Sequence, residues 1–510
     1  MDLTDTWMFD VLQLFAASLV VLLGLLVITV IILYITDVTQ SKQTIRRNYP
    51  VLGRFRYMFE HMGEFFRQYF FSMDREEMPF NRAERSWVYR AAKNVDRTIA
   101  FGSTRNILAP GSIYFVNCAY PTLEDAVEPP ALVTIGPGCQ QPYTTSALIN
   151  ISGMSYGALS KPAIRALSRG AAKAGVWMNT GEGGLSPYHL EGGCDIVFQI
   201  GTAKFGVRDA LGRLSDEKLR EVASHDAVKM FEIKLSQGAK PGKGGILPAV
   251  KVSEEVARIR GIPEGEPAIS PNRHRDISNA DELLDMIERV RSVTGKPTGF
   301  KAVMGGAERF AEFFEKVLQR GVDSAPDFIT LDSADGGTGA APQPLMDYMG
   351  LPLQESLPIL VDLLCQYGLR DRIKVVCSGK LIVPSGVAWA LSIGADFVVS
   401  ARGFMFSIGC IQALQCNKNT CPTGITTHDK KLQRGLNPAN KSERVANYVA
   451  NITKDVEMIA HSCGVAEPRQ LRRLHSRMVT ETCRSLTLEQ LYPTVANASI
   501  EERRILEKVE

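Results

Sequence analysis

The sequence lacks a large excess of charge of either sign. Its 58 Lys and Arg residues nearly balance 55 Asp and Glu residues, which leaves a formal net charge of +3 over 510 residues. Nucleic-acid binding needs a concentrated basic face, so this balance gives no support for a nucleic-acid partner. Hydrophobic residues make up 45% and charged residues 22% of the chain. These ordinary values exclude a disordered, collagen-like or multi-span membrane protein.

Two other common signals are missing. Ten cysteines in a chain of this length do not make a disulfide scaffold. No G-x-G-x-x-G fingerprint of a dinucleotide-binding fold is visible. A redox cofactor in this chain would therefore exchange electrons with a separate donor or acceptor protein.

One long apolar run is present, at residues 11–35, with no charge between Asp10 and Asp37. A helix of this length crosses a ~30 Å hydrocarbon core. A cleaved signal peptide would need a basic start and a shorter apolar stretch, so we expect a single-pass anchor. Lys42, Arg46 and Arg47 follow the run, and the positive-inside rule then places the rest of the chain in the cytoplasm, on a cell inner membrane.

The segment after the anchor, residues 49–71, is rich in aromatic residues interspersed with arginines. Its apolar residues recur at spacings of three and four, which predicts one apolar helix face. Two interpretations stay open: a helix at the membrane interface, or a helix packed on the globular domain. The residues of this face are Phe55, Phe59, Met62, Phe66 and Tyr69.

Between residues 148 and 403 short runs rich in Val, Ile and Phe alternate with helical patterns. Eight such repeats predict an α/β fold, a (β/α)8 TIM barrel; a doubly wound sheet is the competitor, but its phosphate loop is missing after the first run. A long Gly- and Pro-rich linker follows the fourth run, from 236 to about 277. The expected strands are Leu148–Ser152, Val176–Thr180, Ile196–Gly201, Lys229–Leu235, Gly299–Met304, Phe328–Asp332, Ile373–Ser378 and Phe397–Ala401. The expected helices are Lys161–Ala174, Asp281–Val293, Ala307–Gln319, Ser356–Tyr367 and Ser385–Ser392.

Glycines crowd at the carboxyl ends of these strands, where barrel active sites lie. The last two strands end in Ser378-Gly379-Lys380 and Ala401-Arg402-Gly403, a position where many barrels bind a phosphate. This cationic interior suits flavin mononucleotide (FMN) and an anionic substrate. The polar groups that the other strand ends offer are Glu182, Gln199, Lys234, Lys240, Lys301 and Asp335.

A cysteine cluster follows the last strand. Cys410, Cys416 and Cys421 have the spacing C-x5-C-x4-C, and Pro422 comes next. Three thiols this close can converge on one centre. They suit a cuboidal cluster that lacks one iron, whereas a structural zinc needs a fourth ligand, which His428 would supply. Both interpretations stay open on spacing alone.

The ordered motifs NTGEGG (179–184), EIKLSQGAKPGKGG (232–245), ISPNRHRDI (269–277), ADGGTGAAP (334–342) and the cysteine segment resemble one known family. Residues 130–470 look like the FMN-binding synthase domain of glutamate synthase, in a stand-alone form. The resemblance implies a [3Fe–4S] cluster on the three cysteines, and Glu182 and Lys240 facing the substrate. The expected FMN-binding set is Ser152, Gly153, Met154, Gln199, Lys301, Asp335, Gly336, Gly337, Gly379, Arg402 and Gly403.

Two departures from the family are visible. The chain begins Met1-Asp2 and enters the apolar run, so we expect no glutaminase activity of its own. The family's GGQLP segment reads GGILP, with Ile246 in place of a glutamine that helps to hold 2-oxoglutarate. Loss of one polar contact can change substrate discrimination by ~10⁴-fold.

The sequence therefore predicts a membrane-anchored enzyme in which electrons pass through the cluster to FMN and reductively aminate an oxo acid, with 2-oxoglutarate as the first candidate. Two alternatives remain: an amino-acid or amine dehydrogenase that feeds membrane electron carriers, and an electron-transfer subunit without catalysis. The expected domains are an anchor (1–40), a pre-barrel segment (41–130), the barrel with its iron–sulfur segment (131–480) and a tail (481–510).

Overall fold

The computed structural model describes residues 3–96 and 98–493. Most of the expected tail, from residue 494 onward, lies outside them. The chain forms two compact units, Met1–Arg82 and Ala83–Glu510, and each is described by itself. The expected domain boundaries otherwise stay a prediction.

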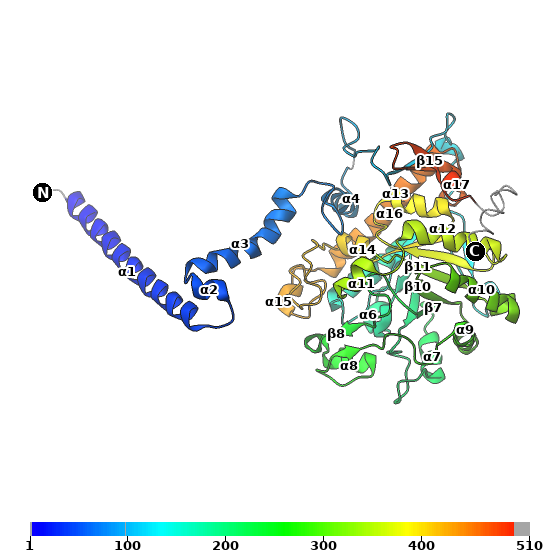
Figure 1. The fold of residues 1–510 in the computed structure, drawn as a ribbon, viewed down its shortest axis with the longest axis horizontal. Coiled ribbons are helices and arrows are strands. Elements are labelled where there is room, and N and C mark those ends of the chain that lie inside the picture. The colour runs from blue at the N-terminus through cyan, green and yellow to red at the C-terminus, as the bar shows by residue number, and fades with distance from the viewer. Residues whose placement is uncertain (1–2, 97, 494–510) are drawn as a thin grey trace. The chain divides into compact units, whose positions relative to one another are not determined.

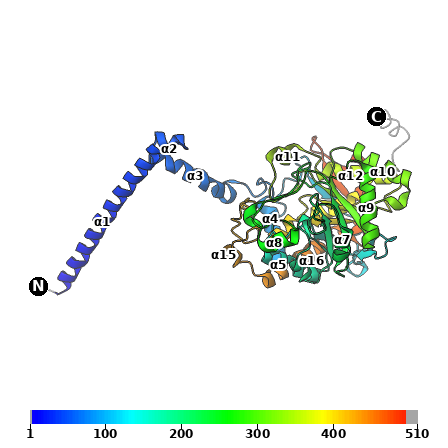
Figure 2. The ribbon, with the colours of Figure 1, turned by 90° about the horizontal axis from the view of Figure 1, so that it is seen from below.

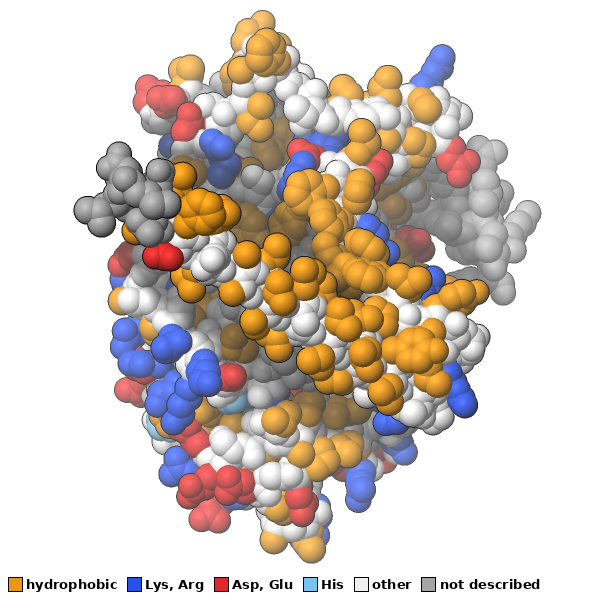
Figure 3. Space-filling model, turned by 90° about the vertical axis from the view of Figure 1, so that its left-hand side faces the viewer, with side chains coloured by type: hydrophobic (Ala, Val, Ile, Leu, Met, Phe, Trp, Pro, Cys, Tyr) orange, Lys and Arg blue, Asp and Glu red, His pale blue; other side chains and the backbone are white. Residues whose placement is uncertain are grey.

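The smaller unit consists of helices. Helix α1 spans Leu3–Thr39 and contains the whole apolar run; α2 (Thr44–Asn48) and α3 (Leu52–Phe66) follow, and a π-helical turn, η1, continues to Phe71. Within the described residues, α1 is the one helix long and apolar enough to cross a membrane, by length and composition. Most side chains of α1 are hydrophobic and exposed, and Figure 3 shows hydrophobic side chains gathered on the face that it presents.

The larger unit is a closed barrel of eight parallel strands surrounded by helices (Figures 1 and 2). The eight expected strands are confirmed, and each observed strand end lies within two residues of the expected one. In barrel order they are β10 (Thr298–Val303), β11 (Phe328–Asp332), β12 (Lys374–Ser378), β13 (Phe397–Ser400), β4 (Ile149–Ile151), β5 (Met178–Asn179), β6 (Ile196–Ile200) and β7 (Val228–Lys234).

The five expected helices are also present, and each follows its strand. They are α5 (Lys161–Ala174), α9 (Ala280–Thr294), α10 (Glu308–Arg320), α12 (Leu353–Gln366) and α13 (Pro384–Ile393). The carboxyl-terminal helix α16 (Pro438–Ser462) packs against α5. That packing is close, because a Cβ on Gly170 of α5 would collide with the Val445 side chain.

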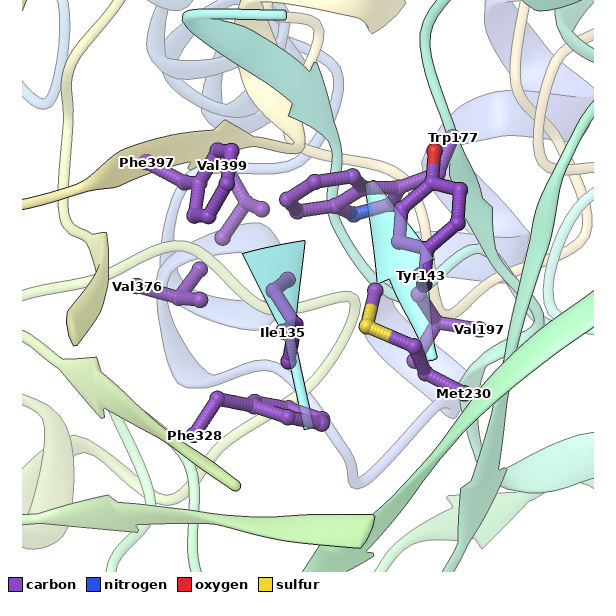
Figure 4. Packing of buried hydrophobic residues seen from close by; sticks show 9 residues of the cluster. All are labelled: Ile135, Tyr143, Trp177, Val197, Met230, Phe328, Val376, Phe397 and Val399. Carbon is purple, nitrogen blue, oxygen red and sulfur yellow. The ribbon is translucent and has the colours of Figure 1, made fainter. Parts of the chain in front are cut away.

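A hydrophobic cluster closes the amino-terminal mouth of the barrel (Figure 4). The hairpin of β2 (Val133–Ile135) and β3 (Tyr143–Thr145) supplies Ile135 and Tyr143, which pack against residues at the starts of the barrel strands. Trp177 contacts Phe397 edge-on at 5.0 Å between ring centroids. With this end filled, ligands can enter only from the carboxyl-terminal mouth.

The expected linker after β7 has structure of its own. It forms a hairpin of β8 (Ile246–Leu247) and β9 (Ala268–Ile269), with helix α8 (Glu254–Arg260) between them. Glu255 of α8 accepts hydrogen bonds from Tyr156 (2.6 Å) and Tyr188 (2.5 Å), which follow β4 and β5. These contacts hold the segment from β8 to β9, called the β8–α8–β9 excursion below, over the carboxyl ends of the strands.

Candidate active site

A cavity of about 180 Å³ opens at the carboxyl-terminal mouth of the barrel. Strand ends form its floor, and residues of the β8–α8–β9 excursion and of the cysteine loop form its walls. Of the residues that the sequence singled out, those in its lining are Gly153, Met154, Glu182, Gln199, Lys234, Lys240, Ile246, Gly337, Arg402 and Cys416.

Glu182 lies in a 3-10 turn, Gly181–Gly183, directly after β5. Its Oε2 is 3.1 Å from Nζ of Lys234, the last residue of β7. Burial by itself raises the pKa of the Glu182 carboxyl, but the charges of Lys234 and Lys240 outweigh burial and hold this pKa below its ordinary value. The Glu182 carboxylate lies close against the backbone of the next loop, because a Cβ on Gly245 would meet its Oε1 and the side chain would have to shift. Glu182 is therefore ionised at neutral pH in the ligand-free site.

Cations outnumber this carboxylate. Lys240 and Arg260 line the same cavity and are 7% and 4% exposed. Burial lowers the pKa of Arg260 to about 10, and burial followed by the charge of Lys234 lowers the pKa of Lys240. The Arg260 Nη2 donates to the Tyr156 carbonyl at 3.2 Å, while its Nε is buried without a partner in the described residues. The surplus of buried positive charge needs an anionic ligand.

A buried polar layer lies beneath the cavity. Glu232 of β7 accepts hydrogen bonds from Gln199 (2.6 Å), Asn179 (2.9 Å) and Thr330 (2.6 Å). Lys301 of β10 pairs with Asp332 at 3.0 Å. Burial opposes the charge of Lys301, but Asp332 and then Glu232 raise its pKa, so it stays protonated. The layer fixes Gln199 and Lys301 in defined positions under the cavity.

The remaining expected flavin contacts are not among the residues that line the cavity. Ser152 lines a smaller inner cavity beside Glu232. Asp335 pairs with Lys380 at 2.7 Å, so the ends of β11 and β12 are bridged by an ion pair. Gly336 and Gly379 lie in the loops after β11 and β12, whereas Gly403 lies in the first turn of helix α14, where a Cβ would collide with the Tyr448 hydroxyl.

The residues present fit a flat flavin. A Cβ on Gly153 would lie 3.3 Å from the Gly181 Cα and 3.5 Å from Gln199 Nε2, and one on Gly337 would lie 2.9 Å from Arg402 Nε. Bare backbone at both places leaves space that a side chain would fill. Lysine and amide donors face the same space, as an electron-accepting ring requires.

The cysteine loop begins after α14 (Arg402–Ser407) and borders the cavity through Cys416. Nη1 of Arg402 lies 3.8 Å from the Cys416 thiol. Lys251 is 2% exposed and donates to the carbonyls of Cys416 (2.8 Å) and Thr426 (2.6 Å). Two cations therefore hold this loop against the cavity wall.

The backbone of the loop is strained. Gln412, Leu414 and Asn419 adopt positive φ values of 58°, 54° and 61°. For Gln412 and Leu414 this conformation costs of the order of 1–2 kcal/mol each, whereas asparagine adopts it more readily. Tyr89 of α4 (Arg82–Lys93) holds the loop's start by donating to the Cys410 carbonyl at 2.6 Å. Strain that the surroundings maintain in this way is typical of functional loops.

In the part of the chain that the structure describes, the three cysteines do not meet at a closed metal site. In residues 3–96 and 98–493, no three His, Cys, Asp or Glu side chains are close enough to hold one metal ion. His428, the expected fourth zinc ligand, instead bonds the Gly157 carbonyl at 2.8 Å.

No sequence pattern points to Arg260, Lys251 or Gln237, although all three line the cavity. Arg260 and Lys251 lie in the expected linker, where charged residues normally face solvent. The only available signal was their position within the excursion that follows β7.

Comparison with known proteins gives the family of the chain. The conserved region of glutamate synthases matches residues 123–466. A glutamate synthase large subunit-like protein of Bacillus subtilis, YerD, is 41% identical over 501 residues, which cover 90% of this chain and 95% of that protein. An archaeal-type glutamate synthase [NADPH] of Thermotoga maritima is 32% identical over 64% of this chain and 61% of its own length.

Solved structures of similar shape include a mandelate oxidase, with a TM-score of 0.46 and 17% identity over 77% of this chain and 98% of that one. This likeness concerns the fold alone. The match to the conserved region and the identity to YerD over nearly its whole length carry the assignment: the chain belongs to the glutamate synthase family.

Proposed function

We propose that this protein is an FMN- and iron–sulfur-dependent oxidoreductase that acts on CH–NH2 groups and reductively aminates an oxo acid, 2-oxoglutarate being the first candidate. An oxidoreductase of the glutamate synthase type follows from the family. The observation that carries the finer proposal is the cavity in which Lys234, Lys240 and Arg260 surround a single carboxylate, Glu182.

Each of these side chains has a task that its position supports. When bound, FMN would supply hydride transfer and a [3Fe–4S] cluster on Cys410, Cys416 and Cys421 one-electron transfer from a separate protein. The Arg260 fork and the Lys240 ammonium would pair with substrate carboxylates. Both are buried, so each contact forms in a dry site.

Glu182 would manage the proton at the substrate nitrogen. In the ligand-free site its pKa is low because of the neighbouring ammonium groups. A substrate carboxylate that engages Lys240 would neutralise part of that charge and raise the pKa of Glu182. Substrate binding would therefore bring Glu182 closer to the pKa that proton transfer at neutral pH requires.

A second direction of the same chemistry is supported by α1. If α1 crosses a membrane, it would tether the barrel near membrane electron carriers, which would suit an amino-acid or amine dehydrogenase. A purely electron-transferring subunit has no use for the buried Glu182–Lys234 pair. We propose that the protein is anchored in the cell inner membrane with its barrel in the cytoplasm.

The test of the chemistry is anaerobic flavin spectroscopy on the purified full chain. The reduced protein is mixed with ammonium and each of a panel of oxo acids, and the oxidised protein with the matching amino acids. We expect one oxo acid to restore the oxidised flavin spectrum. If no member of either panel changes the spectrum of a fully loaded protein, catalysis on CH–NH2 groups is excluded.

Topology is tested separately. A reporter fused after Glu510 should be active only in its cytoplasmic form, because Lys42, Arg46 and Arg47 follow the apolar run. Activity of a reporter that works only in the periplasm would reverse the orientation.

A further inference from the structure

Helix α3 and the turn η1 carry an apolar face that is exposed within the smaller unit. Phe55, Met58 and Phe59 are 51%, 43% and 61% exposed. Phe70 and Phe71 in η1 are each 74% exposed, and their rings lie 5.5 and 6.4 Å from that of Phe66. The helix is amphipathic, since Arg56, Glu60 and Arg67 fall on its other side. An apolar face of this size marks an interaction surface.

The start of α3 is pinned to the end of α1. Asp37, in the last turn of α1, is 1% exposed. It accepts hydrogen bonds from the Arg54 guanidinium at 2.8–3.0 Å and from the Val51 backbone N–H at 3.0 Å. The helix also approaches α2 closely, because a Cβ on Gly53 would lie 2.8 Å from the Ile45 carbonyl oxygen. The first turn of α3 is therefore held at the residue where the apolar run ends.

If α1 crosses a bilayer, the Asp37 contacts determine how deep in the membrane α3 begins. The last turn of a spanning helix lies at the boundary of the hydrocarbon core, so α3 would begin in the headgroup region. Amphipathic helices with aromatic residues on one face lie in that region, parallel to the membrane. Residues 40–72 also contain six basic residues against two acidic ones, Glu60 and Glu64. Such an excess attracts anionic lipids.

We propose that the apolar face of α3 and η1 inserts into the headgroup region of the bilayer that α1 crosses, with a preference for anionic lipids. The inference rests on the membrane-spanning part of the proposal above and is independent of the catalytic part. The apolar face of α3 and η1 could instead contact the barrel unit or a second copy of the chain, and the test below distinguishes these two cases from membrane insertion.

The test uses the full chain in lipid nanodiscs of phosphatidylcholine and phosphatidylglycerol, with a photoreactive diazirine in the acyl chains. Mass spectrometry after illumination should find lipid adducts on peptides of residues 52–71 as well as 11–35. The double substitution Phe55→Ser and Phe59→Ser should lower the adducts on α3 by about five-fold, because the apolar anchors are lost, and leave those on α1 unchanged. Omitting phosphatidylglycerol should lower the α3 adducts in the wild-type chain.

The matched control is Glu60→Gln, on the polar side of the same helix, which should leave both adduct levels as in the wild type. Adducts on α1 with none on α3 would overturn the proposal. Protein crosslinks from α3 to the barrel unit or to a second copy, in place of lipid adducts, would assign the face to that occupant. A lack of adducts on both helices would overturn the span and this inference, whereas flavin spectroscopy of the same sample would still report on catalysis.

Discussion

Replacing Cys416 with Ser is expected to remove iron and the broad visible absorbance from the purified protein while most of the flavin stays bound. A hydroxyl is a poor ligand for iron where a soft thiolate is needed. Even loss of an outer-shell partner costs 10–100-fold in metal affinity, so iron content should fall by at least about ten-fold. Flavin should remain, because its expected contacts lie on strand ends such as Gly153 and Gln199 and not on the cysteine loop.

The matched control is Cys365→Ser, which changes an exposed cysteine outside the loop. Its iron and flavin contents should equal those of the wild type, each measured per mole of protein. An unchanged iron content in Cys416→Ser would show that the three cysteines do not carry a cluster.

Lys240→Ala is expected to weaken the apparent affinity for the substrate acid by about ten- to a hundred-fold. A hydrogen bond to a charged partner is worth about 1.5–3 kcal/mol, which corresponds to that range. Flavin content should hold, because Lys240 lies in the loop after β7 over the cavity. The control Lys243→Ala removes an exposed lysine three residues further on and should have little effect. Steady-state constants of Lys240→Ala equal to those of the wild type would exclude a substrate contact.

The affinity should also depend on pH through Lys240. Burial and the charge of Lys234 lower the pKa of Lys240, and only its protonated form attracts a carboxylate. Wild-type affinity should therefore fall as the pH rises from neutral toward this lowered pKa. In Lys240→Ala the part of the pH dependence that this group causes should be lost.

Ile246→Gln, measured in the same steady-state assay, tests which oxo acid is the native substrate. Ile246 lines the cavity and is 49% exposed, so its side chain is free to face a ligand. If the native acid is 2-oxoglutarate, the restored amide should be neutral or helpful. If the pocket suits a more apolar acid, the change should raise 2-oxoglutarate turnover and depress the native reaction.

The barrel could be predicted from the sequence because its strands are local patterns. Phe328–Asp332 was expected from its apolar run alone and forms β11 with the same bounds. The central strands are buried on both faces, so each reads as a continuous apolar run with a Gly-rich end. The expected run Val176–Thr180 shrinks to the two-residue strand β5, because pairing with the neighbouring strands, which no local pattern shows, sets strand length.

The excursion after β7 escaped prediction for a related reason. Its strands β8 and β9 are two residues each and pair across twenty intervening residues, so neither has a local period. The sequence alone determined that Glu182, Lys240 and Cys416 follow barrel strands and therefore meet at one mouth. That Arg260 and Lys251 turn inward to join them follows from the packing of the folded chain, because burial of a cation depends on what lies over it. Here the covering segments are the excursion held by Glu255 and the cysteine loop that Lys251 bonds.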